Sequence, residues 1–389
     1  MARVYLDYNA TSVPRVSAKE AVAAAMMAPA NASSVHTEGR AARAIVEDAR
    51  HQLAVLIGAE PECIFFTSGA TESNATALSP QLELAGEKVR CDVLVLSGVE
   101  HPSVRAGGSF GEDAAIYIPV DRNGVVDVGA LEGVLQGHRA QKRRAFVSVM
   151  AANNETGVLQ PLRRIADVVH ENDGVFHTDA VQVVGKIPFD LRESGADLVS
   201  ITSHKLGGPQ GAGAVVSAHR DTRLPAIMRG GGQERGRRQG TESVAAIAGF
   251  GAAATEAGQT LTPEGSRLGA LRAKIEEGIR SIAKDAVIFG ERAARLPNTS
   301  FFAAPGITAE VALIMFDLEG VALSAGSACS SGKSAASPAL QAMGVSSEIG
   351  RCAMRVSTGW NTTDADVDEF LRVWSKVYTS LNKRGARAA

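Results

Sequence analysis

The sequence predicts an α/β protein with two lobes, the larger of which contains a mostly parallel β-sheet. Two observations carry this prediction. Between residues 63 and 218, short apolar runs alternate with segments of helical spacing, which is typical of strands covered on both faces by helices. Near residue 260 this alternation gives way to longer amphipathic helices, which indicates a smaller α+β lobe towards the C-terminus.

The elements of the large lobe follow from their apolar spacing. A helix is expected over residues 38–57, because its charges lie on one side of the helical pattern. Further helices are expected over 72–86 and 162–173. Buried strands are expected over residues 63–69, 92–98, 145–150, 175–180, 197–202 and 212–218.

The small lobe begins with an amphipathic helix over residues 266–285. A second helix is expected over 309–320, and a C-terminal helix over 364–381 closes the lobe. Its strands are expected over residues 287–290, 298–303 and 354–359.

Composition narrows the possible functions. The chain has 389 residues, 45% of them apolar, which is enough for two sizeable cores. The formal net charge is −2, so no overall basic field indicates nucleic acid or an anionic membrane as a partner. No apolar run approaches the roughly 20 residues of a membrane span. The N-terminal segment enters a strand-like pattern without an apolar leader, so we expect a cytoplasmic protein.

One of the four cysteines differs from the others. Cys63, Cys91 and Cys352 lie beside apolar runs and are expected to be buried and inert. Cys329 lies in "SAGSACSSGKSAASP", a stretch with almost nothing to bury. None of the four forms a C-x-x-C pair, so neither a zinc site nor a dithiol redox site is expected.

Polar residues gather where the expected strands end. Small residues after the strand at 63–69 begin a helix whose N–H groups suit a phosphate, although an ordinary helix cap explains them equally well. His101 follows the strand at 92–98, and alone it fits a surface or capping residue. Asp179 lies at the end of the strand at 175–180, and a buried carboxylate there needs a partner. A protonated ligand nitrogen or a distant arginine would supply one.

The stretch "SITSHKLGGPQG" places Thr202, His204 and Lys205 after a buried strand and before a glycine-rich turn. Ligands of such sheets bind beyond the carboxyl ends of the strands, so these side chains and those above are expected to share one site. Together they provide phosphate donors, an aromatic ring, an acid and a lysine. Pyridoxal phosphate requires this set, because a lysine bonds to its aldehyde carbon and an acid pairs with its ring nitrogen.

A series of motifs in the same order resembles the cysteine desulfurases of the NifS/IscS type, within class V of the aminotransferase-like fold. The matching stretches span nearly the whole chain and are "YLDYNAT", "SSVHTEGR", "FTSGATESN", "EHPSV", "NNETG", "HTDAVQ", "SHKLGGPQG", "GGGQERGRRQGT", "GSACSSG" and "MRVSTG". The resemblance implies fold type I, with a seven-stranded sheet in a large pyridoxal-phosphate-binding domain at 15–257. A small domain of residues 1–14 and 258–389 would carry the catalytic cysteine loop.

The resemblance implies conversion of L-cysteine to L-alanine, with transfer of the sulfur to Cys329 as a persulfide. Lys205 would carry the cofactor, and His101 would stack on its ring and move protons. Asp179 would pair with the ring nitrogen, and Arg355 would bind the substrate carboxylate. The phosphate would be held by Ala70, Thr71, Thr202, His204 and, from a neighbouring subunit, Thr241. Contacts to the ring oxygen or the substrate carboxylate would come from Asn154 and Gln182. The site mouth would lie near Asn31, His36 and Arg40.

The same resemblance implies a homodimer that delivers sulfur to an iron–sulfur scaffold or another sulfur-acceptor protein. A transient role for Cys329 as a ligand of an iron–sulfur cluster stays open, and no permanent metal is expected. The chain departs from the family after "ACSSG", where Lys333–Ser337 replaces a run like "SLEPS" that often meets the acceptor. The acceptor is therefore left undefined.

Three alternatives remain at this stage. A selenocysteine lyase, or a related pyridoxal-phosphate-dependent β-lyase or aminotransferase, could use much the same residues, although an aminotransferase would not need Cys329. The basic stretch "RGGGQERGRRQG" could bind RNA, but the slightly negative net charge and the 5% aromatic content argue against it. A regulator that keeps only the fold is disfavoured by the intact Lys205, Asp179 and Cys329.

Overall fold

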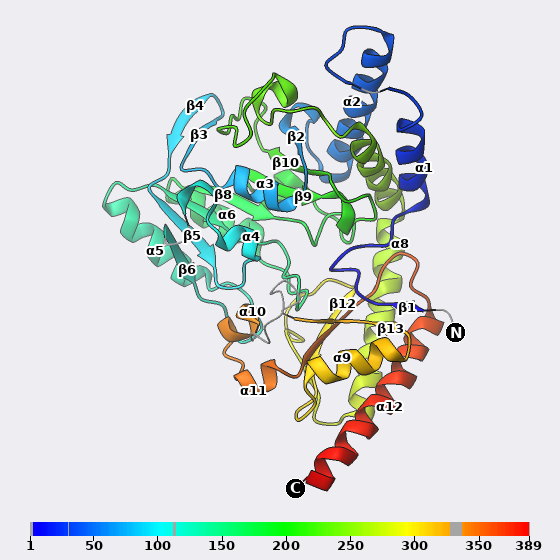
Figure 1. Cartoon of the computed structure of the whole chain (residues 1–389). Coiled ribbons are helices and arrows are strands. Elements are labelled where there is room, and N and C mark those ends of the chain that lie inside the picture. The colour runs from blue at the N-terminus through cyan, green and yellow to red at the C-terminus, as the bar shows by residue number, and fades with distance from the viewer. Residues whose placement is uncertain (1–2, 30, 112–113, 327–336, 389) are drawn as a thin grey trace.

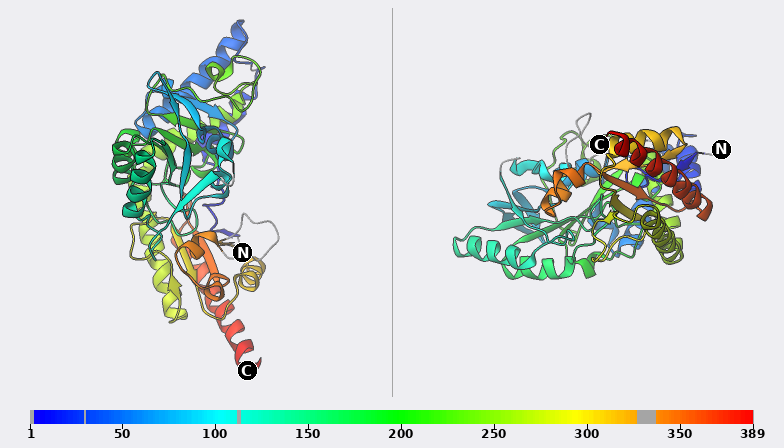
Figure 2. Two further views of the ribbon diagram at one scale, coloured as in Figure 1. Left: turned by 90° about the vertical axis from the view of Figure 1, so that its left-hand side faces the viewer. Right: turned by 90° about the horizontal axis from the view of Figure 1, so that it is seen from below.

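The computed structural model describes residues 3–29, 31–111, 114–326 and 337–388, with side chains to residue 382. Two lobes lie one above the other in Figure 1, the upper built around a large sheet and the lower containing the yellow-to-red C-terminal elements. Figure 2 shows that the C-terminal helix projects from the lower lobe, away from the large sheet. The α/β class and the mostly parallel seven-stranded sheet are confirmed.

The large sheet is parallel except for one strand. β10 (Gly213–Ser217) runs antiparallel to both of its neighbours, β2 and β9, whereas the pairs from β9 through β6 are parallel. In spatial order the strands are β2 (Ile64–Thr67), β10, β9 (Leu198–Thr202), β8 (Val175–Asp179), β7 (Ala145–Ser148), β5 (Val93–Ser97) and β6 (Ala115–Ile118).

Both faces of the sheet are buried because helices cover each side. Alternate residues of β2 enter different apolar clusters, with Phe66 in one and Phe65 in the other. The apolar runs that predicted six of the strands reflect this burial on both faces. The edge strand β6 is only partly buried and was not predicted, although its sequence "AIYI" is wholly apolar. The covering helices are α1 (Val16–Ala25), α2 (Thr37–Ile57), α3 (Ala70–Ala77), α4 (Pro102–Arg105), α5 (Val128–Ala140), α6 (Leu162–Glu171), α7 (Leu191–Ser194) and the first half of α8 (Val244–Ile282).

The helix expected over residues 72–86 is wrong in its second half. α3 ends at Ala77, and residues 81–84 form β3 (Gln81–Leu84), which pairs with β4 (Glu87–Arg90). Pro80 cannot continue a helix, because it lacks the N–H group and clashes with the preceding turn. The hairpin turns at Ala85 and Gly86, with φ values of 51° and 83°. Leu82 is buried as part of this hairpin, and the free energy of its burial outweighs the helical spacing of the apolar residues.

The small lobe packs helices on a four-stranded antiparallel sheet. Its strands, in spatial order, are β11 (Val287–Ile288), β12 (Thr299–Ala303), β15 (Ala353–Ser357) and β14 (Ser324–Ala325). Phe316, Phe370 and Trp374 stack in its core, joining α9 (Ala309–Leu318) to α12 (Asp364–Ala388). Short helices α10 (Pro338–Ala342) and α11 (Ser347–Gly350) lie before β15.

Two chain segments connect the lobes. The N-terminal strand β1 (Val4–Tyr5) pairs in parallel with β13 (Val321–Ala322), which ties the start of the chain to the small lobe. The helix α8 passes through the predicted boundary at 257/258, with Phe250 in the large-lobe core and Ile275 in the small-lobe core. None of the helices among the described residues is long and apolar enough to cross a bilayer.

Candidate active site

A cavity of about 390 Å³ lies where the parallel strands end and the N-terminal segment approaches them. Its size is within the range of small-ligand sites, roughly 300–1,000 Å³. The strand ends and following turns bring together many of the residues expected from the sequence. These are Ala70, Thr71, His101, Asn154, Asp179, Gln182, Thr202, His204 and Lys205, all of which line this cavity.

Lys205 ends a short 3₁₀ turn that follows β9 directly. Its Nζ donates hydrogen bonds to the backbone carbonyls of Asn9 and Ala10, the latter at 2.7 Å. The N-terminal segment therefore reaches the lysine from the other lobe. Next to it, His204 Nδ1 lies 3.1 Å from Thr11 Oγ1. Burial and the nearby charges of Lys205 and Lys186 lower the pKa of His204 to about 4, so its ring is neutral at pH 7.

The two glycines after Lys205 are required by close packing. Gly207 has a φ of +99°, and a Cβ there would lie 2.7 Å from Arg15 Cγ. A Cβ on Gly208 would lie 2.1 Å from Ser203 Oγ, well inside contact distance. The turn that presents Lys205 can therefore form only with a bare backbone at these positions.

Asp179 and His101 are joined by a chain of hydrogen bonds. Asn74 Nδ2 donates to Asp179 Oδ2 and to Ser103 Oγ, both at 2.9 Å. Ser103 Oγ lies 2.8 Å from His101 Nδ1, and Val181 N donates to Asp179 Oδ1 at 3.0 Å. Burial, together with the charge of Lys205, lowers the pKa of His101, while Asp179 acts in the opposite direction. Asp179 is thus a buried acceptor, fixed by two donors, at the cavity wall.

The N-terminus of α3 forms another wall of the cavity. Gly69, its N-cap, provides no side-chain cap, so the first N–H groups of the helix face a region lined by Ser68, Ala70 and Thr71. A Cβ on Gly69 would meet nothing within 4 Å, whereas one on Gly213 would lie 2.7 Å from Gly69 Cα. The strand β10 therefore packs tightly against one side of this turn, and the side towards the cavity is open. Such a helix terminus favours an anion.

Arg355 lies beside the cavity but does not line it. It is 3% exposed on β15, and it forms an ion pair of 2.7 Å with Asp7 and a 2.9 Å hydrogen bond to the backbone carbonyl of Asn154. Its Nε is buried with no partner among the described residues. This unused donor faces the interior, and a ligand carboxylate could satisfy it.

Several expected site residues are not at the cavity. Thr241 is exposed, which is compatible with, but does not test, its expected contact with another subunit. Asn31, His36 and Arg40 are also exposed and do not line the cavity; the His36 ring accepts from Gly39 N and caps α2. Cys329 lies outside the described residues, as do the unusual residues 333–336. Cys63, Cys91 and Cys352 are buried, as expected from the sequence.

Glu100 is a site neighbour that sequence reasoning missed, although it precedes His101. Its Oε1 accepts hydrogen bonds from Ser97 Oγ and from Met150 N, the latter at 2.8 Å, whereas the buried Oε2 has no partner in the part of the chain that the structure describes. Burial raises the pKa of Glu100 to about 8, with a smaller contribution from Asp179. Glu100 is therefore a neutral acid at pH 7.

We expect the unfolding free energy to fall as pH rises from about 5 to about 8, because Glu100 must ionise earlier in the unfolded chain, with an ordinary pKa of 4.5, than in the folded one. The expected slope is on the order of 1 kcal/mol per pH unit. Glu100→Gln removes this loss, so its unfolding free energy should exceed that of the parent at pH 9 and match it near pH 5. Urea midpoints at both pH values measure the difference. Exposed Glu87→Gln is the control, and parallel pH profiles for all three proteins would contradict the prediction.

The cavity residues fit pyridoxal phosphate. The α3 terminus with Thr202 and His204 suits the phosphate, and Lys205 can bond to the aldehyde. The buried Asp179 suits a protonated ring nitrogen, because its present donors, Val181 N and Asn74, are both neutral. Asn74 Oδ1 is a further buried atom with no partner among the described residues. This donor and acceptor set agrees with the set expected from the sequence.

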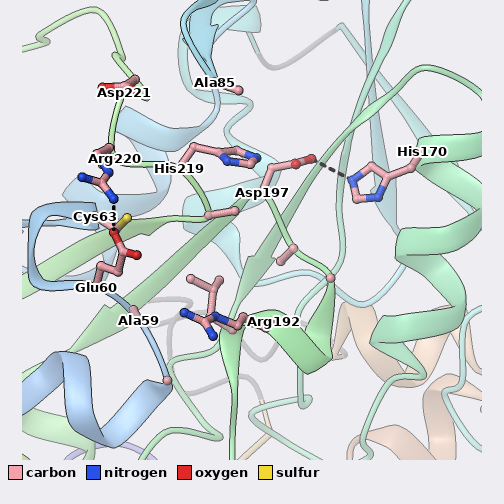
Figure 3. Close-up of a pocket in the computed structure, with 15 residues that line it drawn as sticks. Ala59, Glu60, Cys63, Ala85, His170, Arg192, Asp197, His219, Arg220 and Asp221 are labelled. Atoms are coloured by element: carbon pink, nitrogen blue, oxygen red, sulfur yellow. Dashed lines mark hydrogen bonds and ion pairs between the residues drawn. The ribbon is translucent and has the colours of Figure 1, made fainter.

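A second cavity, of about 450 Å³, lies at the opposite ends of the strands (Figure 3). Two pairs of its charged side chains interact: His170 Nε2 lies 3.1 Å from Asp197 Oδ2, and Arg220 lies 3.4 Å from Glu60. The Asp197 carboxylate also accepts a hydrogen bond from Phe176 N. It thereby joins the residue before β9 to the start of β8. None of the expected site residues lines this cavity, and we assign it no role in the chemistry.

Comparisons with known proteins agree with the geometry of the first cavity. The family model described as aminotransferase class-V matches residues 4–370, and the chain belongs to this family. A "Cysteine desulfurase" from Gluconacetobacter diazotrophicus is 40% identical, over 98% of this chain and 95% of that protein. "Cysteine desulfurase NifS" from Azotobacter vinelandii is 38% identical, over 96% and 92%. The solved NifS-like protein from Rickettsia africae has a TM-score of 0.87 and 30% identity, over 97% of this chain and 99% of that one. Within class V, the chain is a cysteine desulfurase of the NifS/IscS type.

Proposed function

We propose that this cysteine desulfurase binds pyridoxal phosphate in the cavity beside Lys205 and converts L-cysteine to L-alanine, passing the sulfur to Cys329. The observation that supports the proposal is the placement of Lys205, Asp179 and the α3 terminus around one cavity. These three features supply an amine, an acid and an anion site from separate strand ends. No other chemistry needs all three together as directly as a pyridoxal-phosphate enzyme does.

The cofactor would be held at both ends. Its phosphate would bind the N–H groups of Ala70 and Thr71, with Thr202 and His204 beside them. Gln182 and Asn154 would contact the ring oxygen or the substrate carboxylate. When bound, the cofactor supplies an electron sink that makes the substrate Cα–H acidic.

The chain's own residues would manage the protons. Asp179 would keep a proton on the ring nitrogen, because its carboxylate is buried and its fixed oxygens accept only. The Lys205 amine would carry the Cα proton, and the carbonyls of Asn9 and Ala10 define where that amine rests. His101 would be neutral, because its pKa is lowered, and its Nδ1 is held by Ser103. It would cover the ring and accept or donate a proton there.

Cys329 would react as a thiolate and receive the sulfur of the substrate. Its Sγ would attack the Sγ of the substrate, so that an S–S bond forms and the substrate Cβ–S bond breaks. The electron pair of that bond stays with the three-carbon fragment, which takes up protons and leaves as alanine. The balance is L-cysteine plus the Cys329 thiol giving L-alanine plus the Cys329 persulfide. Arg355 would bind the substrate carboxylate, for which its buried Nε is a suitable unused donor.

The persulfide must be discharged to a second thiol or to a scaffold. We propose a cytoplasmic homodimer that delivers sulfur to an iron–sulfur scaffold or another acceptor protein. In support, Thr241 is exposed on a glycine-rich stretch that Glu234 anchors to Arg50 through an ion pair of 2.8 Å. An anchored stretch can present Thr241 to a neighbouring subunit in a defined position.

Asp179→Asn tests the proposal. The purified parent should absorb near ~420 nm, a general property of pyridoxal bound to a lysine, and should form alanine from L-cysteine. We expect Asp179→Asn to lower the rate about a hundredfold or more, because an amide cannot stabilise the charge on the ring nitrogen. The fold should survive, because Asn74 Oδ1, which accepts from no described residue, can turn towards the new amide. Exposed Asp317→Asn is the control. A colourless parent, or an unchanged rate in Asp179→Asn, would refute the proposal.

A further inference from the structure

A second lysine, Lys186, is buried behind the cavity, and the chemistry above does not use it. Its side chain is 8% exposed, four residues after Gln182. Its Nζ donates to Gln182 Oε1 at 2.6 Å and to Asn9 Oδ1 at 2.8 Å. Both partners are neutral amides. Burial and the charges of Lys205 and Arg355 lower the pKa of Lys186 well below its usual value.

Lys186 determines which way both amides face. A lysine has only donors, so the atoms that it contacts must be the amide oxygens. Gln182 must then direct its Nε2 to the other side, where it donates to the backbone carbonyl of Asn9 at 3.1 Å. Asn9 must likewise direct its Nδ2 away, where it donates to Thr299 Oγ1 at 2.9 Å and to the Asn154 carbonyl at 3.2 Å. Lys186 strengthens this orientation of both amides, which the Asn9 carbonyl also favours for Gln182 and Asn298 Nδ2 also favours for Asn9.

These two amides lie at the centre of the site. The Asn9 carbonyl that accepts from Gln182 also accepts from Lys205 Nζ. Asn9 further accepts from Asn298 Nδ2 at 3.1 Å, so it joins the N-terminal segment to the small lobe. Gln182 itself lines the cavity. The orientation set by Lys186 therefore decides whether Gln182 offers a donor or an acceptor near Lys205.

We propose that Lys186 is a positioning residue, which holds the Gln182 amide as a donor beside the cofactor oxygen and fixes the Asn9 carbonyl that receives Lys205. The part concerning the cofactor rests on the proposed function. A ring oxygen that carries negative charge needs a donor, and the reversed amide would present an acceptor to it. Stability alone does not explain Lys186, because burying an amine without a carboxylate partner is unfavourable.

The test compares Lys186→Met, Gln182→Ala and the double variant, with exposed Lys88→Met as control. Each full-length protein is titrated with pyridoxal phosphate, which gives a dissociation constant and a visible spectrum without relying on turnover. We expect Lys186→Met to weaken binding about tenfold and to alter the spectrum, which reports the hydrogen bond to the ring oxygen. Gln182→Ala should weaken it similarly, and the two losses should be less than additive in the double variant, because Lys186 acts on the cofactor in part through Gln182. Urea unfolding without cofactor should show Lys186→Met at least as stable as the parent.

Two outcomes would overturn the inference: an unchanged affinity and spectrum in Lys186→Met, or fully additive losses in the double variant. Should Lys186→Met not fold, Lys186→Gln provides the same comparison, because its amide still has a donor for Gln182 Oε1. We expect that variant to bind more tightly than Gln182→Ala, and equal losses would count against a positioning role. Failure of the proposed function is distinguished by the parent protein, which would then not bind pyridoxal phosphate at all.

Discussion

Lys205→Ala should lower the rate of alanine formation from L-cysteine by about 10³-fold or more and should abolish the absorbance near ~420 nm. Two losses combine in this variant. The amine that bonds to the cofactor aldehyde disappears, and so does the group that carries the substrate Cα proton. No described neighbour can substitute, because the amine of Lys186 is already held by Gln182 and Asn9.

The variant should nevertheless fold. Lys205 is only partly buried, and the carbonyls of Asn9 and Ala10, which accept hydrogen bonds from it, lie where water in the cavity can replace it. Urea unfolding therefore checks that the loss is chemical, and Lys19→Ala, an exposed substitution on α1, is the matched control. Retention of more than a tenth of the parental rate in Lys205→Ala would exclude this lysine as the cofactor amine.

Cys329→Ala should abolish sulfur release from L-cysteine while leaving cofactor binding intact. The reason is chemical: without a thiolate to attack the substrate sulfur, the Cβ–S bond has no route for breaking towards a persulfide. The variant should keep its absorbance at about 420 nm, because Lys205 and Asp179 lie on a cavity whose described lining residues all come from other segments. Sulfide release in the presence of a reductant, measured beside alanine, gives the result.

Thiol labelling makes this second prediction specific. The other three cysteines are buried, at 2–3% exposure, so a thiol reagent applied to the folded parent should modify Cys329 first. Cys63→Ala is the control, and it should keep both labelling and activity. If Cys329→Ala released sulfur at the parental rate, a lyase or aminotransferase would explain the site better than a desulfurase.

The sequence was sufficient to predict the strands that matter most for the site. β8 and β9 are buried along their whole length. Each begins with an apolar pair and ends on a polar residue that cannot be buried without a partner. This change from apolar to polar residues at the strand ends indicated Asp179 and Lys205 as site residues. The helix expected over 72–86 was wrong in its second half. The helical spacing of its apolar residues continues there, but Pro80 and the hairpin turn both end a helix.

Contacts between distant segments were not predictable in the same way. Asn9 meets Lys186 across 177 positions of sequence, and Arg355 meets Asp7 across 348. Nothing in the local pattern around Lys186 distinguishes it from a solvated lysine after a turn. Glu100 was overlooked for a similar reason, since its full burial results from Met150 and Ser97 converging on it only in the folded sheet.

The helix α8 limits how the two lobes can move. It contributes to both cores without interruption, so bending one lobe towards the other would strain a 39-residue rod. Pro263 withholds one backbone hydrogen bond, and the neighbouring pair Gly265–Ser266 also weakens this part of the helix. Since α8 is nevertheless continuous here, we expect the two lobes to keep their relative orientation when substrate binds. Superposing structures with and without L-cysteine on the described residues of one lobe would measure any rotation of the other.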